Sequence, residues 1–280
     1  MNISLAINEG ISILKKNSIF TAELDSELLM SKVMNKDRKN IILYQNQKLD
    51  PELYKNFKFL INQRKKRKPI AYLIGKKDFW KYQFSISEGV LIPRPDTEII
   101  VDEALKIAKN KSNFKVLDIG LGSGCILFSI LKEKKFFRGV GIDVSKKCIE
   151  IAKINALELG LLNRVKIIKS DVDNYNCGKY DLIISNPPYI NKLDLNYLDK
   201  DIINFEPKIA LNGGLDGLSV VRKVISKASK LIKKNGSFII EIAFNQKNKI
   251  KNLLIKEGFY INKIVKDYAK NDRCIISTKT

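Results

Sequence analysis

The sequence predicts an α/β fold: a mostly parallel sheet with helices on both faces, preceded by a small helical bundle and a β-hairpin. From residue 115 onward, short apolar runs alternate with amphipathic stretches, which is the pattern of a parallel sheet and its connecting helices. Upstream of residue 75 the apolar residues follow a helical period only. A chain of 280 residues with 45% hydrophobic content can hold one large domain and a smaller companion.

The first 75 residues are expected to form the helical bundle. Asp50 supplies an N-cap and Pro51 the first position of one helix. Apolar residues then recur at the spacing of a buried helix face: Leu53, Phe57, Leu60 and Ile61. Shorter amphipathic helices are expected over 3–16, 21–34 and 38–44.

Residues 76–95 are expected to link the bundle to the sheet as a hairpin. Apolar residues alternate there with a period of two: Phe79, Tyr82, Phe84 and Ile86, followed by the run 90–92. Asp96 or Thr97 is then expected to cap a helix that runs to about residue 109. The domains expected from these patterns are 1–75, 76–95 and 96–280.

Strands and helices alternate through the last of these domains. Strands are expected at 115–119, 138–142, 165–169, 181–185, 237–242, 259–265 and 273–278. Helices are expected at 123–133, 145–159, 217–233 and 246–257, with Gly160 and Gly258 directly after two of them. The last two strands have no helix between them, so we expect them to pair antiparallel.

The composition excludes several classes of chemistry. The chain has no histidine, and its cysteines form no C-x-x-C pair: Cys125, Cys148, Cys177 and Cys274. A zinc site and a Ser-His or Cys-His nucleophile are therefore not expected, no metal is expected, and the cysteines are expected to be reduced. No apolar stretch approaches the ~20 residues that span a bilayer, and residues 1–9 lack the features of a signal peptide, so we expect a cytoplasmic protein that binds no membrane.

The net charge of +21 suggests contact with nucleic acid. Lys, Asn and Ile are frequent along the whole chain, however, which is typical of compositional drift. The densest basic run, 64–68, ends an expected helix, where cations complement the helix dipole. It is either a solvated face or a surface that contacts RNA or an acidic partner.

A glycine turn follows the strand 115–119. Gly120, Gly122 and Gly124 form a G-x-G-x-G pattern that lets the backbone turn tightly and approach a ligand, although a purely structural turn would also explain it. The next strand ends at Asp143, where a carboxylate can accept both hydroxyls of a ribose. The third is followed by Asp171, where a carboxylate can accept from an adenine amine.

The strand 181–185 ends in Asn186-Pro187-Pro188-Tyr189. Ligands bind at this edge of open α/β sheets. The prolines remove two backbone donors and fix φ, so the carbonyls are held stiffly and stay out of a ladder. An amide, stiff carbonyls and an aromatic face form a clamp for a planar NH2 group, with a simple turn as the alternative.

Together these motifs resemble the class I S-adenosylmethionine-dependent methyltransferases, which have a seven-stranded Rossmann-like sheet. The resemblance implies S-adenosyl-L-methionine as cofactor and S-adenosyl-L-homocysteine as product. It implies a cofactor site formed by Asp118, Gly120, Leu121, Gly122, Ser123, Gly124, Asp143, Asp171, Val172 and Asn186. Asp118 would lie near the methionine ammonium group. Val172 stands where the family often has an aromatic residue against adenine, and Tyr175 is the alternative.

Further motifs narrow the resemblance to the peptide chain release factor N5-glutamine methyltransferases of the PrmC/HemK family. They are 69–75, Phe79-Trp80, 91–98 and 205–207. The substrate implied is the glutamine in the Gly-Gly-Gln loop of a release factor, with no obligatory nucleic acid, although a basic face could contact RNA. Alternatives are a ribosomal-protein glutamine methyltransferase, an adenine-N6 nucleic-acid methyltransferase and a non-catalytic binding module.

The resemblance gives the tetrapeptide a catalytic and substrate-binding role. Asn186 and the Pro187 carbonyl would accept the two N–H bonds of the glutamine amide, and Tyr189 would pack on its plane beside Pro188. The polar residues of 91–98 are expected to hold the junction between domains, or else to lie at the substrate entrance: Arg94, Asp96 and Glu98.

Overall fold

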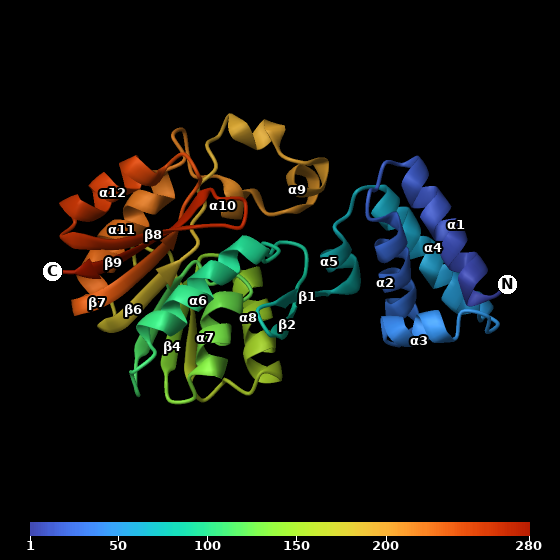
Figure 1. Ribbon diagram of the computed structural model, residues 1–280, viewed down its shortest axis with the longest axis horizontal. Helices are drawn as coiled ribbons and strands as arrows, with labels where there is room; N and C mark the ends of the chain where they lie inside the picture. Colours follow the sequence, from blue (N-terminus) through green and yellow to red (C-terminus); the bar gives the residue numbers. More distant parts are fainter. The chain divides into compact units, whose positions relative to one another are not determined.

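A computed structural model describes all 280 residues of the chain. The chain divides into two compact units (Figure 1). The first comprises Met1–Lys76 and Asp199–Phe205, and the second comprises Lys77–Leu198 and Glu206–Thr280. The segment Asp199–Phe205 therefore belongs to a unit far from it in sequence, which no sequence pattern indicates.

The first unit is helical, as expected. Its helices are α1 (Ile3–Lys16), α2 (Ala22–Met34), α3 (Arg38–Leu43), α4 (Pro51–Lys65), α5 (Ile70–Ile74) and α9 (Lys200–Phe205). The side chain of Asp50 accepts hydrogen bonds from the backbone of Glu52 and Leu53, so the expected cap of α4 is present. Phe57 and Ile61 of α4 are buried against α1 and α2 in the core of this unit, which confirms the expected apolar face.

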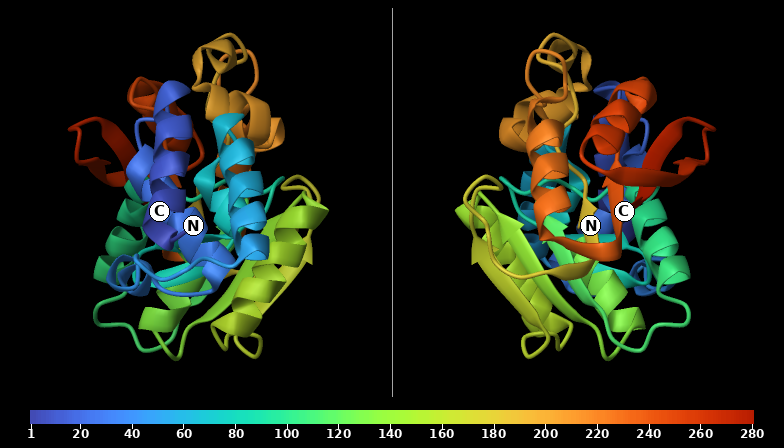
Figure 2. Two further views of the ribbon diagram at one scale, coloured as in Figure 1. Left: turned by 90° about the vertical axis from the view of Figure 1, so that its right-hand side faces the viewer. Right: turned by 90° about the vertical axis from the view of Figure 1, so that its left-hand side faces the viewer.

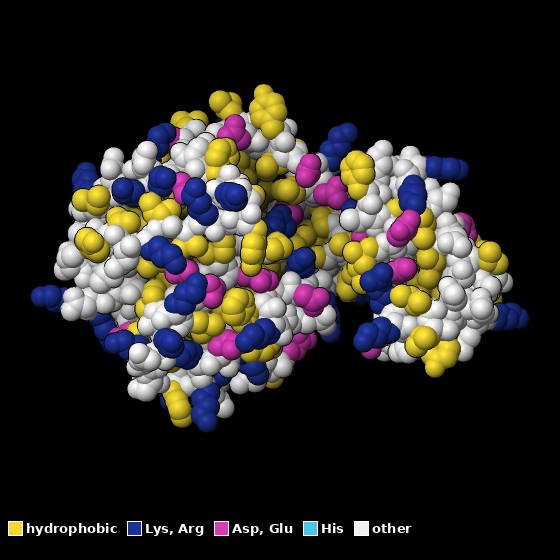
Figure 3. All heavy atoms as spheres, in the orientation of Figure 1, with side chains coloured by type: hydrophobic (Ala, Val, Ile, Leu, Met, Phe, Trp, Pro, Cys, Tyr) yellow, Lys and Arg dark blue, Asp and Glu magenta, His cyan; other side chains and the backbone are white.

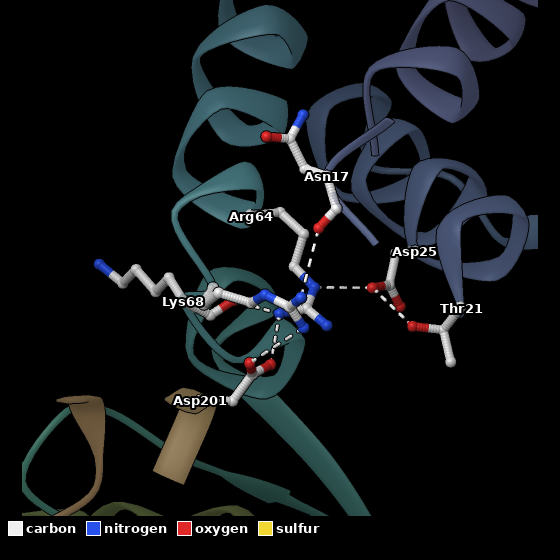
Figure 4. Close-up of polar contacts among 7 residues, drawn as sticks. Asn17, Thr21, Asp25, Arg64, Lys68 and Asp201 are labelled. Atoms are coloured by element: carbon white, nitrogen blue, oxygen red, sulfur yellow. Dashed lines mark hydrogen bonds and ion pairs between the residues drawn. The ribbon is translucent and has the colours of Figure 1, made fainter. Parts of the chain in front are cut away.

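The basic run 64–68 begins with a buried arginine (Figure 4). Arg64 is only 7% exposed, and its guanidinium donates to Asp25 and Asp201, both at 2.7 Å. Asp25 also accepts from the Thr21 hydroxyl, at 2.9 Å. Lys65 and Lys66 are exposed. Both interpretations of the sequence treated the run 64–68 as one exposed surface, which is wrong for Arg64. An arginine is buried only with a charged partner, and sequence spacing does not show that Asp25 and Asp201 lie beside Arg64.

The two-stranded hairpin consists of β1 (Lys76–Phe79) and β2 (Tyr82–Ser85). The run 90–92, which was expected to continue it, is not a strand. Gly89 has a φ of +86°, a left-handed conformation that breaks the alternating pattern. Val90 is instead buried against Cys148 and Ile151.

The second unit contains a seven-stranded sheet in the order β5-β4-β3-β6-β7-β9-β8. The strands are β3 (Lys115–Ile119), β4 (Arg138–Asp143), β5 (Val165–Lys169), β6 (Tyr180–Ser185), β7 (Ile232–Glu241), β8 (Phe259–Lys266) and β9 (Asp272–Lys279). The first five are parallel, and β9 pairs antiparallel with both β7 and β8. The expected strands and their mostly parallel pairing are confirmed.

Helices cover both faces of this sheet (Figures 1 and 2). One face packs on α6 (Glu98–Ile107), α7 (Cys125–Glu133) and α8 (Lys146–Glu158), and the other on α11 (Ser219–Leu231) and α12 (Lys247–Lys256). Alternate residues of β3 serve the two cores, Val116 on the first face and Leu117 on the second. Short elements lie outside these layers: η1 (Pro95–Thr97), η2 (Asp194–Tyr197) and α10 (Lys208–Leu211).

Lys and Arg side chains are scattered over the face of the molecule shown in Figure 3, among acidic and apolar side chains. This fits the spread of lysine along the sequence. No helix is long and apolar enough to cross a bilayer. All four cysteines are free, and only Cys177 is exposed.

Candidate active site

A cavity of about 300 Å³ lies in the second unit, where the loops after β3, β4, β5 and β6 meet. Parallel strands bring these loops to one edge of the sheet. Eight of the residues expected to form the site line the cavity: Gly120, Gly122, Asp143, Asp171, Val172, Asn186, Pro187 and Pro188. Five do not: Asp118, Leu121, Ser123, Gly124 and Tyr189. The structure thus brings the glycine loop, two of the acids and the tetrapeptide to one hollow.

The glycine loop connects β3 to α7 through left-handed backbone. Gly122 and Gly124 have φ values of +58° and +84°, which favour glycine. A Cβ atom on Gly124 would lie 2.2 Å from the Phe128 ring, so this position also needs glycine for packing. Leu121 is buried against Gly141 of the neighbouring strand, and its side chain supports the loop from behind.

Asp143 braces the same loop from the end of β4. Its Oδ2 accepts from the backbone N–H of Gly122 at 2.8 Å, and its Oδ1 accepts from that of Ser145 at 2.9 Å. Burial raises the pKa of Asp143 above its ordinary value, although these backbone hydrogen bonds oppose the shift. Asp143 lines the cavity, and each of its oxygens can accept a further hydrogen bond, as ribose hydroxyls would need.

Asp118 is buried beneath the loop with no visible partner. It is 0% exposed, and neither carboxyl oxygen has a hydrogen bond. Burial, and then the nearby charge of Asp143, raise its pKa well above the ordinary value. A buried orphan carboxyl favours a positive charge close by. These carboxyl groups therefore fit a cofactor that carries positively charged ammonium and sulfonium groups.

The loop after β5 separates the two residues considered for the adenine contact. Val172 lines the cavity beside Asp171. Tyr175 instead lines a different cavity of about 640 Å³ and shares a hydrogen bond of 2.6 Å with the Tyr180 hydroxyl. Asp171 Oδ1 accepts from the backbone of Asp173, which holds this turn in place.

The tetrapeptide is anchored at both ends. The Asn186 side chain donates from Nδ2 to the Thr97 hydroxyl at 3.2 Å, and the Tyr189 hydroxyl donates to Glu241 Oε1 at 3.1 Å. The Tyr189 carbonyl accepts from Gln246 at 2.9 Å. A Cβ atom placed on Gly120 would lie 4.0 Å from the Asn186 carbonyl, so the glycine loop and the tetrapeptide face each other closely.

Thr97 does not cap a helix as expected, because its side chain makes no capping hydrogen bond. Asp96 does not cap α6 either: it lies in η1 and forms an ion pair with Arg273 at 3.6 Å. Sequence spacing correctly located the start of the helix but not the use of these side chains. Both side chains interact with groups other than the first turn of α6.

The other polar residues of 91–98 also have partners within the second unit. Arg94 donates to Glu206 at 2.5 Å, and the backbone of Ile92 donates to the other oxygen of Glu206 at 3.4 Å. Glu98 accepts from the backbone of Trp80 at 2.9 Å. These contacts join three sequence motifs, 79–80, 91–98 and 205–207. The role of Arg94, Asp96 and Glu98 at the junction between domains stays a prediction.

Several residues of the site were not expected from the sequence. The cavity is also lined by apolar side chains from the linker, the turn after β4, α10 and α11: Leu91, Val144, Ile209, Val220 and Val224. Their sequence signal is only that of ordinary core residues. Glu241 could have been found, because it follows the apolar run 238–240 at a strand end, as Asp143 does.

Comparisons with known proteins agree with this architecture. Residues 6–75 match the family model of the PrmC N-terminal domain, and residues 110–275 match that of a methyltransferase domain. A solved ribosomal protein L11 methylase from Lactobacillus delbrueckii subsp. bulgaricus superposes with a TM-score of 0.51 over 73% of this chain and 90% of its own, at 18% identity, which shows a shared fold.

Relatives match the chain over its whole length. A release factor glutamine methyltransferase of Clostridium acetobutylicum is 37% identical over 100% of this chain and 99% of its own. One of Buchnera aphidicola subsp. Baizongia pistaciae is 38% identical over 95% of each chain. Because both units and the full length are covered at this identity, the chain belongs to the family of release factor glutamine methyltransferases.

Proposed function

We propose that this protein transfers a methyl group from S-adenosyl-L-methionine to the side-chain N5 of the glutamine in the Gly-Gly-Gln loop of peptide chain release factors. The observation that carries the proposal is the approach of the glycine loop to Asn186 across one cavity. A methyl donor held by the loop and an amide held by the tetrapeptide would be neighbours. The names of the full-length relatives support the same substrate.

The residues of the cavity suit the methyl donor. Asp143 and Asp171 present carboxylates for the hydroxyls of a ribose and the amine of an adenine, and Val172 offers an apolar contact. Asp118 is buried beneath the loop with both oxygens unpaired, and the ammonium of the amino-acid part would favour its ionised form. S-adenosyl-L-methionine, when bound, supplies a methyl group already activated by its sulfonium.

The tetrapeptide has the task of aligning a weak nucleophile. The nitrogen of a primary amide is poorly nucleophilic because its lone pair is delocalised into the carbonyl. The Oδ1 of Asn186 and the carbonyl of Pro187 would accept the two N–H bonds, which directs the lone pair toward the methyl group. The same acceptors stabilise the positive charge that develops on nitrogen.

The reaction needs no histidine. A new C–N bond forms as the C–S bond breaks, and the amide nitrogen then loses a proton to water. Tyr189 would pack on the plane of the substrate amide. Its own hydroxyl stays protonated, since burial raises the pKa of Tyr189 further above its ordinary value.

The proposal is tested by incubating the protein with isotopically labelled S-adenosyl-L-methionine and purified release factors. We expect one methyl group on the glutamine of the Gly-Gly-Gln loop, located by tandem mass spectrometry, and none on a release factor in which that glutamine is replaced. Ribosomal protein and adenine-containing DNA serve as the other arms. Methylation of either one, with the release factor unmodified, would contradict the proposal.

A further inference from the structure

Gln246 holds the backbone of the tetrapeptide at its far end. Its side-chain NH2 group donates to the carbonyl of Tyr189 at 2.9 Å and to that of Gly217 at 3.2 Å. Its side-chain oxygen accepts from the backbone N–H of Ala243 at 3.2 Å. Gln246 is 7% exposed, so water does not compete freely for these groups. One buried amide therefore joins the tetrapeptide to two later segments of the chain.

The surroundings of Gln246 determine which end of its amide faces the tetrapeptide. The two carbonyl oxygens can only accept hydrogen bonds, and the backbone N–H of Ala243 can only donate. The observed orientation satisfies both kinds of group, whereas a flipped amide would place its oxygen against both carbonyls. Gln246 is also the N-cap of α12, but its side chain makes no capping hydrogen bond. The side chain is therefore free to bind the tetrapeptide.

The tetrapeptide needs such a contact because its prolines supply no backbone N–H. Pro187 and Pro188 cannot donate to a neighbouring strand, so this stretch is held mainly through its side chains and carbonyls. The carbonyl of Tyr189 is the only one of its four carbonyls with a hydrogen-bond partner in the protein. At the other end the chain leaves β6 at Ser185, whose hydroxyl donates to the carbonyl of Ile119 at 2.6 Å. The Pro187 carbonyl thus lies between two fixed ends.

A glycine bend packs against the same carbonyl. The bend comprises residues 213–217 and contains Gly213, Gly214 and Gly217. Gly217 has a φ of +72°, and a Cβ atom there would lie 2.5 Å from the oxygen of Tyr189 and 2.8 Å from Nε2 of Gln246. A side chain at this position would push the tetrapeptide carbonyl away from Gln246. The position therefore requires glycine for the close approach as well as for its backbone conformation.

The bend also leads to a wall of the cofactor cavity. Helix α11 begins two residues after Gly217, and its first two turns line the cavity with Ser219, Val220 and Val224. The NH2 group of Gln246 binds the carbonyl of Gly217 and the carbonyl of Tyr189 at the same time. It therefore bridges the segment that would hold the substrate amide and the segment that begins this wall.

We propose that Gln246 is a positioning residue that fixes the tetrapeptide relative to the cofactor cavity. This inference rests on the proposed function, in which the Pro187 carbonyl accepts from the substrate amide beside Asn186. Gln246 does not line the cavity, so it acts through the tetrapeptide. By holding two carbonyls at once, it sets the distance between the substrate nitrogen and the methyl donor. A misplacement of about 1 Å is enough to lower the rate of such an aligned reaction about 100-fold.

The first test is Gln246→Met. Methionine keeps the length of the side chain but can donate no hydrogen bond at any pH. We expect kcat on a release factor to fall about tenfold or more, the effect of one or two lost hydrogen bonds. Affinity for S-adenosyl-L-homocysteine should change little, because the glycine loop and Asp143 are untouched. Gln47→Met is the control, since the side chain of Gln47 is exposed and makes no hydrogen bond.

A purely structural Gln246 would give a different result. Gln246→Met would then lower the melting temperature, but kcat would match that of the wild type at any temperature at which both proteins are folded. Turnover is therefore compared at a temperature well below both unfolding transitions, with saturating cofactor and release factor.

A second pair of variants perturbs the same contact from the other side. Gly217→Ala places a methyl group against the Tyr189 carbonyl. Gly160→Ala is the matched control, because Gly160 also has a left-handed φ, +68°, but a Cβ atom there meets nothing within 4 Å. Both changes strain the backbone in the same way. We expect kcat to fall about tenfold or more in Gly217→Ala alone, through the displaced tetrapeptide.

A measurement without substrate separates this inference from the proposed function. The backbone N–H groups of Ile190 and Lys192, directly after the tetrapeptide, donate to the carbonyls of Leu211 and Gly214. Their exchange with deuterated water, followed by nuclear magnetic resonance, should be faster in Gln246→Met than in the wild type, because the contact next to them is lost. Exchange of the β6 amides should be unchanged and serves as the internal reference.

The outcomes distinguish the two claims. If the wild type methylates a release factor and folded Gln246→Met matches it in kcat, the positioning role is wrong and the function stands. If the wild type leaves the release factor unmodified, the proposed function fails, and unchanged exchange at Ile190 and Lys192 would overturn the contact as well. If Gln246→Met does not fold, equal kcat in Gly217→Ala and Gly160→Ala contradicts the positioning role.

Discussion

The hydroxyl of Tyr189 donates to the carboxylate of Glu241 at 3.1 Å, which ties the last residue of the tetrapeptide to the end of the adjacent strand. The aromatic ring is therefore held from its polar end. Together with the hydrogen bond from Gln246 to the Tyr189 carbonyl, this contact makes the clamp rigid before any substrate arrives.

Replacing Asn186 by alanine removes an acceptor that the substrate amide needs most as charge develops. We expect kcat to fall by about 100-fold or more, by analogy with the loss of one group that stabilises transition-state charge. Affinity for S-adenosyl-L-homocysteine, measured by calorimetry, should change little. Near-normal turnover would remove Asn186 from its assigned role.

Replacing Asp143 by alanine should act chiefly on cofactor binding. The change removes acceptors for the ribose and also the brace on Gly122 and Ser145. We expect affinity for S-adenosyl-L-methionine to weaken roughly 10- to 100-fold, the loss of one or two charge-assisted hydrogen bonds. Glu150→Ala, on the exposed side of α8, is the control. Unchanged affinity in calorimetry would exclude the ribose role.

Substitutions of Val172 and Tyr175 distinguish the two candidates for the adenine contact, because they are expected to change cofactor affinity differently. Val172 lines the cavity, so Val172→Ala should weaken cofactor affinity by about 1 kcal/mol, the value of the apolar surface lost. Tyr175→Phe removes only a hydroxyl that contacts Tyr180, and affinity should be unchanged. The reverse pattern in a titration would show that the aromatic residue packs on adenine.

The free energy of unfolding should depend on pH through Glu241. Its folded pKa of about 7 exceeds the ordinary value of 4.5, so between these values the folded state binds more protons than the unfolded state. Stability from this group is therefore full below about pH 4.5 and is lost as the pH rises through 7, by roughly 3 kcal/mol in all. Relative to wild type, Glu241→Gln should gain stability between pH 5 and 7.5 in denaturant titrations. A constant difference would contradict the raised pKa.

Arg64 should stabilise the helical unit (Figure 4). Arg64→Ala leaves Asp25 buried without its cation, which is expected to cost about 3 to 5 kcal/mol. Hydrogen exchange of the α2 and α4 amides, followed by mass spectrometry, should become much faster. Lys65→Ala removes an exposed charge next to it and should have little effect. Unaltered exchange in Arg64→Ala would show that the buried pair contributes nothing.

The sheet and the long helices were predictable because their signal is local. The strands around 115–119 and 165–169 begin and end where the apolar runs do. The short helices α9 and α10 were missed, because neither carries a periodic pattern long enough to be recognised. The predicted hairpin was wrongly extended to residues 90–92, because an apolar triplet alone does not reveal the left-handed backbone of Gly89.

The site was predictable where a polar residue follows a strand directly, as Asp143 and Asn186 do. It was not predictable where a side chain reaches another part of the chain, because sequence spacing does not show tertiary partners. The sequence predicts that Thr97 caps a helix, but its hydroxyl accepts a hydrogen bond from Asn186, 89 positions away. The sequence predicts that Arg64 belongs to a basic surface, but its buried guanidinium donates a hydrogen bond to Asp201, 137 positions away.

A crystal structure with S-adenosyl-L-homocysteine and a peptide containing Gly-Gly-Gln tests the role of the tetrapeptide most directly. We expect the glutamine amide nitrogen to lie within about 2.7 to 3.2 Å of both Asn186 Oδ1 and the Pro187 carbonyl. The nitrogen should face the sulfur of the cofactor in the same cavity. A glutamine held elsewhere, or an Asn186 that presents its NH2 group to the peptide, would contradict the mechanism.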